Sequence, residues 1–331
     1  MCIRDSREAI HNAKFGISGR ILDLDGTPAH GAQVALCTVE RGISVTGGRL
    51  EPYRPDDQGT NIRKTDVYGG FAFEQRPEDF ELVVACDCGF ARLTDEQFAA
   101  SPAIRLQPWG RVEGTVHIGR NPGANRLVQL QDFLGTEIGN LIRYRDWSEA
   151  DTDGRFVLEK VPLRWAEIGY VGGTRSRSSL WTNGRSIHIV PGETAHVAIG
   201  ATGRPVVGTL VIPPEYEMPT DLSQVGLVFR TVSPEMPLPE DYARVTQDQQ
   251  YQWRQQWLST PEGQDYFVSV HHNPNHRYFA AVLETDNTFC IEDMIPGRYE
   301  LTVFLQLWKS KALRDISVIN SSPDSCWSDC S

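Results

Sequence analysis

The segment DVYGGFAFE, residues 66–74, decides the fold, because its pattern occurs three times along the chain. In each copy an acidic residue opens a turn, and a Gly or Asn three positions later can adopt positive φ. A strand follows in which a Phe and a second apolar residue share one face. A Pro then ends the strand, since it cannot donate to a β ladder. Each copy therefore predicts a β-hairpin. The motif residues are Asp66, Gly69 and Phe71, then Asp151, Gly154 and Phe156, then Glu284, Asn287 and Phe289.

A Gly-bearing apolar strand precedes each predicted hairpin, at residues 16–22, 110–116 and 205–211. Gly19, Gly114 and Gly208 lie within these strands. Residue classes that recur at matched offsets indicate an internal repeat. The sequence therefore predicts an all-β chain of three tandem β-sandwich domains.

The predicted domains are residues 15–107, 108–200 and 201–318, with joins so short that they favour a semi-rigid rod. Residues 1–14 and 319–331 lack a strand pattern, and the first six resemble a translated adapter sequence. We expect both ends to be disordered or non-native.

The amino-acid composition argues against several classes of function. Hydrophobic residues make up 40% of the 331 residues, enough for packed cores, and the formal net charge is -11. Nucleic-acid binding is not expected, because clustered Lys and Arg side chains are missing. No apolar run approaches the roughly 20 residues that span a bilayer.

The third domain carries an insertion at about residues 231–277, with a helix predicted from about Pro239 to Leu258 and ended by the segment 261–263. Trp253 and Trp257 are four residues apart and share a helix face. Two interpretations stay open. The Trp pair anchors the helix over an open sheet edge, or, with Tyr251, it forms an exposed platform for a carbohydrate or peptide.

His271, His272 and His276 lie within six residues of one another. Imidazoles are common metal ligands, but no Cys or carboxylate completes a site nearby, and a Pro-containing turn explains the segment equally well. We therefore predict no metal and assign these histidines, with the aromatic residues of the insertion, to a candidate ligand surface.

The seven Cys residues show no CxxC pattern. Cys86 and Cys88 alternate in an apolar run and are predicted to share one face of a strand, which disfavours a disulfide between them. Cys37 and Cys290 are predicted to be small core residues. No catalytic motif or phosphate loop is present, so neither enzyme activity nor a cofactor is predicted.

The order of glycines and turns from Gly19 to Phe71 resembles the carboxypeptidase regulatory-like domain. Residues 15–107 match that pattern best, residues 108–200 in fewer positions, and residues 201–318 at Gly208 and from Glu284 to Leu301. The resemblance implies that each domain is a seven-stranded, Ig-like and transthyretin-like sandwich, and that it is an accessory, non-enzymatic part of larger bacterial envelope proteins.

Three functions are consistent with these observations. The first is a stalk or scaffold, in the cell envelope or outside the cell, that presents a fused or partner protein domain. The second is a carbohydrate- or peptide-binding module that uses the aromatic insertion. The third is an accessory region of a thioredoxin-like or peptidase enzyme whose catalytic domain lies elsewhere.

Overall fold

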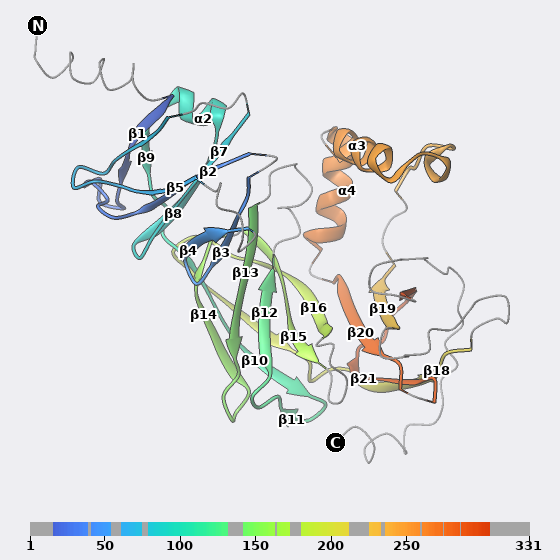
Figure 1. The fold of residues 1–331 in the computed structure, drawn as a ribbon. Helices are drawn as coiled ribbons and strands as arrows, with labels where there is room; N and C mark the ends of the chain where they lie inside the picture. The colour runs from blue at the N-terminus through green and yellow to red at the C-terminus, as the bar shows by residue number, and fades with distance from the viewer. Residues whose placement is uncertain are drawn as a thin grey trace, which may run out of the picture.

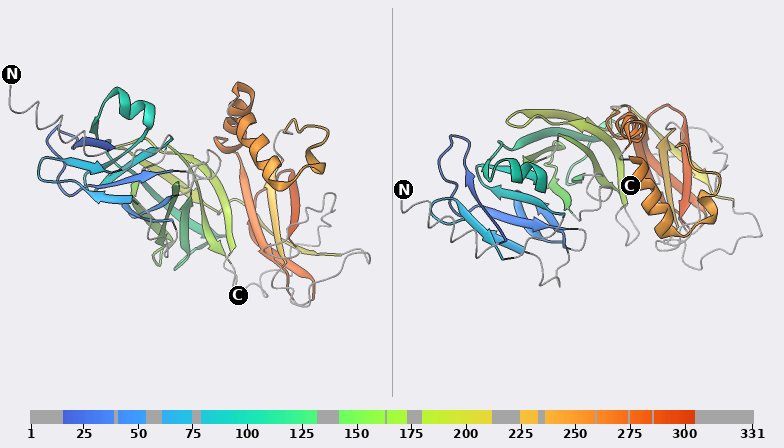
Figure 2. Two further views of the ribbon diagram at one scale, coloured as in Figure 1. Left: turned by 45° about the horizontal axis from the view of Figure 1, so that its top comes forward. Right: turned by 90° about the horizontal axis from the view of Figure 1, so that it is seen from above.

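The computed structural model is built mainly of β-strands, arranged as three units that follow one another across the molecule (Figures 1 and 2). Within the described residues, no helix is long and apolar enough to cross a membrane. The structure describes residues 16–38, 41–53, 61–74, 79–131, 142–162, 164–172, 180–211, 225–232, 236–258, 260–273, 275–284 and 286–304.

The first unit is a two-layer sandwich. One sheet has the order β6-β1-β9 and the other the order β5-β2-β7-β8. The strands are β1 (Ile17–Leu22), β2 (Gln33–Cys37), β5 (Asn61–Lys64), β6 (Gly70–Phe73), β7 (Glu81–Cys86), β8 (Gly89–Thr94) and β9 (Ala103–Arg105). The short helix α2 (Asp95–Ala100) follows β8. The strands β3 (Ile43–Thr46) and β4 (Arg49–Pro52) form a hairpin that belongs to neither sheet of this sandwich.

The second unit repeats this arrangement. The strand β10 (Gly110–Ile118) lies between β14 (Arg155–Val161) and β17 (Thr194–Ile199), as β1 lies between β6 and β9. In both units the first strand pairs antiparallel with the hairpin strand and parallel with the last strand. The remaining strands are β11 (Asn121–Pro122), β12 (Leu127–Gln131), β13 (Ile142–Glu149), β15 (Trp165–Gly172) and β16 (Leu180–His188).

The third unit pairs β18 with β21 and has a second layer in the order β22-β19-β20. Leu227, Phe229, Phe279, Phe289 and Ile291 form the centre of its apolar core. Its strands are β18 (Arg204–Thr209), β19 (Gly226–Thr231), β20 (Arg277–Val282), β21 (Thr288–Met294) and β22 (Tyr299–Phe304).

The same Gly–Phe pair lies at the centre of each unit. The paired residues are Gly19 and Phe71, Gly114 and Phe156, and Gly208 and Phe289. In each pair the Phe ring fills the space that a Cβ on the glycine would need. All three Phe side chains are buried, so an aromatic ring covers a glycine on the neighbouring strand of each sandwich.

The turn before each Phe also recurs. Gly69, Gly154 and Asn287 have φ values of 75°, 77° and 66°. The backbone N–H at each of these positions donates to the carbonyl three residues earlier, on Asp66, Asp151 or Glu284. The Asp66 and Asp151 carboxylates accept two further backbone N–H bonds each, within their own turns.

One sheet passes through all three units. Its nine strands have the order β22-β19-β20-β16-β15-β12-β13-β3-β4. The β3–β4 hairpin joins the first unit to the second because β3 pairs parallel with β13, from Ile142↔Ile43 to Tyr144↔Val45. β16 joins the second unit to the third by pairing antiparallel with β20, at Gly184↔Tyr278 and Arg185↔Arg277.

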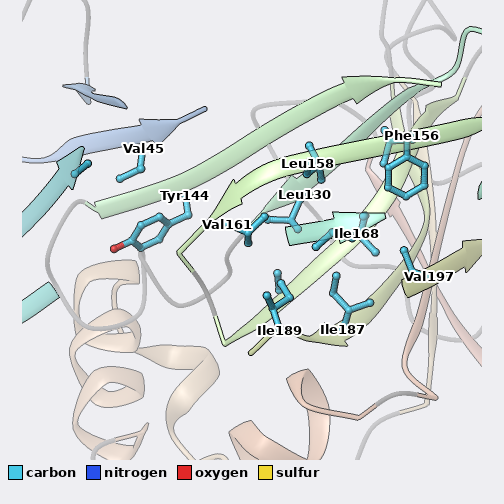
Figure 3. Close-up of a cluster of buried hydrophobic side chains, with 14 of the residues drawn as sticks. Val45, Leu130, Tyr144, Phe156, Leu158, Val161, Ile168, Ile187, Ile189 and Val197 are labelled. Atoms are coloured by element: carbon cyan, nitrogen blue, oxygen red, sulfur yellow. The ribbon is translucent and has the colours of Figure 1, made fainter. Parts of the chain in front are cut away.

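The first and second units also share an apolar core (Figure 3). In β2, Val34 and Leu36 face the core of the first unit, whereas Ala35 and Cys37 belong to the core of the second. The β7 strand divides in the same way, since Val84 lies in one core and Val83 in the other. The sequence of a strand that is buried on both faces is a continuous apolar run, and it does not alternate between apolar and polar residues.

The third Gly–Phe pair allows a clean test, because the atoms nearest to a Cβ at Gly208 all belong to the Phe289 ring. We expect Gly208→Ala to lower the urea midpoint of unfolding, and Phe289→Leu to remove most of this clash. The double variant should then be more stable than the sum of the two single effects, by a coupling of about 1–2 kcal/mol.

The matched control is the second pair. A Cβ at Gly114 would also meet the Val197 carbonyl oxygen, which Phe156→Leu does not move. Gly114→Ala and Phe156→Leu should therefore show much weaker coupling. Additive effects at Gly208 and Phe289 would contradict the proposed ring-over-glycine packing.

Candidate functional site

The insertion in the third unit forms a pair of helices. A one-turn helix, η3 (Tyr242–Arg244), leads into α3 (Gln247–Leu258), which packs against α4 (Pro261–His271). Thr246 caps α3, because its hydroxyl accepts from the Gln249 N–H at 3.3 Å while the Gln249 side chain accepts from the Thr246 N–H at 3.0 Å. Figure 1 shows both helices at one end of β20.

The predicted helix end at Leu258 is confirmed, but α3 begins at Gln247 rather than near Pro239, and a second helix that was not predicted follows it. Pro261 begins α4, where its missing N–H costs nothing in the first helical turn. The Thr260 hydroxyl caps this helix by accepting from the Gly263 N–H at 3.2 Å. α4 then continues to His271, so the histidine segment begins at a helix end rather than in a turn between strands.

Four aromatic rings on η3, α3 and α4 form a continuous series, named here the aromatic ladder: Tyr242, Trp253, Trp257 and Tyr266. Successive centroids are 5.3, 5.8 and 5.2 Å apart. The Trp253 and Trp257 rings are nearly parallel, at 7°, and all four side chains are half-buried. Tyr251 lies in α3, and its side chain is outside the described part of the structure.

The position of the ladder matches neither interpretation of the Trp pair completely. α3 has α4 as its main neighbour, so the pair packs between helical segments instead of anchoring a helix over a sheet edge. The rings also remain partly open to solvent. They offer a ligand ring edges and partial faces, because each Trp face already has an aromatic neighbour.

The three histidines have different partners. The His272 ring stacks on Trp165 of β15 at 4.6 Å and 8°, and His188 packs on the same indole at 4.8 Å. His271 Nδ1 lies 3.6 Å from the buried Glu167 carboxylate. The imidazoles of α4 therefore join the insertion to the second unit.

His276 is buried at 6% exposure, with its Nδ1 3.2 Å from the Thr231 hydroxyl. Burial lowers the pKa of His276 to about 4, with smaller contributions from His271, Arg230 and Arg277. Burial also lowers the pKa of His272, followed by the effects of His271 and His188. Both rings are therefore neutral at pH 7.

Metal binding finds no support in the described segments, which contain no group of three or more His, Cys, Asp and Glu side chains able to hold a metal ion. Cys37 lies in the core that the first and second units share, and burial followed by the charge of Glu81 raises the pKa of its thiol to about 12. A thiol held in its protonated form is a poor nucleophile.

The prediction against a Cys86–Cys88 disulfide is wrong, because the two residues form one. Cys86 ends β7 and Cys88 lies in the tight turn before β8, so the chain reverses between them instead of continuing as a strand. Their Cα atoms are 5.4 Å apart, within the range for a disulfide. Alternation along a strand does not apply across a hairpin turn.

The disulfide lies at the joint between the first and second units. The Trp109 indole N–H donates to the Cys86 carbonyl at 2.9 Å, and the Trp109 ring stacks on Phe90 at 5.2 Å. Lys160 Nζ lies 2.6 Å from the Asp87 carboxylate. Sequence reasoning placed Trp109 in a join between domains but did not identify these partners, which come from a distant hairpin.

A buried carboxylate forms the corresponding joint between the second and third units. Asp293, at 1% exposure, accepts from the backbone N–H groups of Ala201 and Gly203, which lie between β17 and β18. Burial raises the pKa of Asp293, while hydrogen bonds from Ala201, Gly203 and Gly119 oppose that rise. Sequence analysis missed this residue, because one Asp in an amphipathic strand is not distinctive.

Comparisons with known proteins identify no family: no protein-family model and no curated protein matches the chain. Among solved structures, the minor pilin GBS52 from Streptococcus agalactiae is 13% identical, with a TM-score of 0.29 over 55% of this chain and 94% of the pilin. A streptococcal ancillary pilin is 14% identical, with a TM-score of 0.26 over 55% of this chain and 61% of the pilin. The shaft pilin SpaA from Lactobacillus rhamnosus GG is 7% identical, with a TM-score of 0.20 over 55% of this chain and 95% of that one. Likeness at this level assigns no function.

The lowered pKa of His276 predicts how the free energy of unfolding depends on pH. Its folded-state pKa is lowered, so its stabilising contribution is present above the unfolded value of 6.5 and is lost as the pH falls toward about 4. The difference between the unfolded and the folded pKa limits this contribution to the free energy of unfolding to about 3 kcal/mol. We expect His276→Gln to reduce the loss of urea stability between pH 7 and pH 4 relative to the wild type.

The exposed His30 provides the control, since His30→Gln keeps the buried imidazole of His276 and the contacts of Trp165 and His272, and should retain the wild-type pH profile. Equal pH profiles for the wild type and His276→Gln would show that His276 does not titrate in this window.

Proposed function

We propose that the chain is a non-catalytic spacer or scaffold that holds three tandem β-sandwich domains in a fixed arrangement. The proposed domains are residues 15–107, 108–200 and 201–318. The observation that carries this proposal is the nine-stranded sheet, which passes through all three units. A flexible string of domains would share no sheet between neighbouring units.

The buried polar groups support the same function. The Trp109 indole and the Asp293 carboxylate each bind backbone atoms across a joint. Glu167 and His272 connect the helical insertion to the second unit. Buried polar groups must find partners, and these residues find them in contacts that fix one unit against the next.

We place the spacer in the cell envelope or outside the cell, where it presents a fused or partner protein domain. The Cys86–Cys88 disulfide supports an oxidising compartment. The resemblance of residues 15–107 to carboxypeptidase regulatory-like domains supports an accessory role in an envelope protein.

Electron–electron distance measurements test the rigidity of the spacer. Spin labels carried by non-natural amino acids at Lys64 and Glu300, both exposed on strands of the outer units, avoid the native cysteines. The wild type should give one narrow distance distribution. Asp293→Ala should broaden it, because the backbone N–H groups of Ala201 and Gly203 lose their acceptor.

Asp286→Ala is the matched control, since in the described part of the third unit the Asp286 carboxylate accepts hydrogen bonds from Thr288 within its own turn. It should leave the distribution narrow. A broad distribution in the wild type would contradict a fixed arrangement, whatever the variants show.

The aromatic ladder supports a second candidate function, the binding of a carbohydrate or peptide. Half-exposed Trp rings in a series provide stacking surface for sugars and aromatic side chains. We expect Trp253→Ala and Trp257→Ala to weaken binding to ligands found on a glycan array or a peptide array by about tenfold or more, the loss typical of a central aromatic contact.

Trp147→Ala is the control for this test, because Trp147 is 52% exposed on β13 and lies outside the ladder. Binding that survives both ladder substitutions, or that Trp147→Ala removes equally, would exclude the ladder as the binding surface.

A further inference from the structure

A cleft of about 370 Å³ lies where the first and second units meet. One wall comes from β8, α2 and β9 of the first unit, and the other from Pro162, Arg164 and Pro191 of the second. It is separate from the aromatic ladder, and the spacer function does not require it. The cleft has two units in its walls, so its width depends on the joint between them.

The wall on the first unit consists of strand edges. Phe90 to Leu93 are four consecutive residues of β8, and Ala103 to Arg105 are the whole of β9. Successive side chains of a strand point to opposite faces, so a surface lined by consecutive residues is an edge. On β8 the edge is already occupied at Phe90, which exchanges two backbone hydrogen bonds with Gln107. The edge of β9 presents backbone donors and acceptors in a row, which is the surface that an extended peptide recognises.

The charge of the cleft is opposite to that of the chain. Its lining contains Arg92, Arg105 and Arg164 and no Asp or Glu, whereas the chain carries a net charge of -11. Glu81 holds Arg92 through two hydrogen bonds. Arg105 and Arg164 are exposed, and neither forms an ion pair with any residue that the structure describes. Arg105 also donates one hydrogen bond to the Leu24 carbonyl, which leaves its net charge uncompensated.

The remaining lining combines polar and apolar groups. Gln97, Ser101 and Gln107 add neutral donors and acceptors, while Phe90 and the prolines add apolar surface. Such a surface suits an amphipathic peptide better than a small inorganic anion, because the anion gains no favourable contact with apolar side chains. Guanidinium groups bind carboxylates with matched geometry.

We propose that this cleft binds an extended acidic peptide segment, with Arg105 and Arg164 pairing with its carboxylates. The segment lies along the edge of β9, and its apolar side chains contact Phe90 and Pro162. The site belongs to neither unit alone.

Titration calorimetry with the full chain tests this proposal at low ionic strength. The probe is the peptide Ac-EVEVEV-NH2, and the matched neutral peptide is Ac-QVQVQV-NH2. The acidic peptide should bind and the neutral one should bind at least tenfold more weakly. The double variant Arg105→Gln, Arg164→Gln should lose at least tenfold in affinity, and added salt should weaken wild-type binding.

The control variant Arg63→Gln, Arg120→Gln makes the same change in net charge at two exposed arginines outside the cleft, and its affinity should equal that of the wild type. Thermal unfolding of both double variants checks that the fold is kept. Equal loss in both would mean that only net charge matters, and would overturn the site. Inorganic phosphate that binds as tightly as the peptide and displaces it would identify a small-anion site and overturn the peptide assignment.

Discussion

The arrangement of the first two units depends on the burial of β2 and β7 on both faces. One face of these strands completes the core of the first sandwich, and the other closes the core of the second. Pulling the units apart would expose Ala35, Cys37, Val83 and Ala85 together with the strands that cover them, and exposed apolar surface costs about 25 cal/mol per Å². The first two units therefore behave as one packed body, although their sequences repeat.

The boundary between the second and third units is of a different kind. The backbone pairing between β16 and β20 has two registered residue pairs, and the apolar core of the third unit is separate from the core of the second. Polar groups hold this boundary instead. Asp293 binds the backbone between β17 and β18, and Thr182 accepts from the Ala280 N–H at 3.0 Å. Hydrogen bonds specify orientation but contribute less free energy than a shared core, so this boundary is the weaker of the two.

The sequence predicted what is local to each repeat. The acidic turn, the residue with positive φ and the Phe strand lie within ten residues, so a short pattern contains them all. The continuous sheet was not predicted, because within the described residues β3 and β4 have no counterpart in the other repeats, and their partner β13 is about a hundred residues away. One signal was present: the unbroken apolar run from Leu82 to Ala85 indicates a strand covered on both sides.

The candidate site shows the same division between local and distant information. The four-residue spacing of Trp253 and Trp257 placed both rings on one helix face, where they stack. Nothing in the segment around His272 identifies Trp165 as its partner, because that indole belongs to another unit. Pro261 was correctly predicted to follow a helix end, but the second helix was missed because a proline that excludes a helix interior is also well suited to a helix start.

The two candidate surfaces differ in how they depend on the fold. The ladder is built within one insertion, so its ring spacing is set by the packing of α3 on α4 and by the caps at Thr246 and Thr260. The cleft takes its walls from two units, so its width is set by the shared core and by the contacts of Trp109 and Lys160. A change that loosens the first joint therefore alters the cleft and leaves the ladder intact, which makes the shared core a requirement of one surface only.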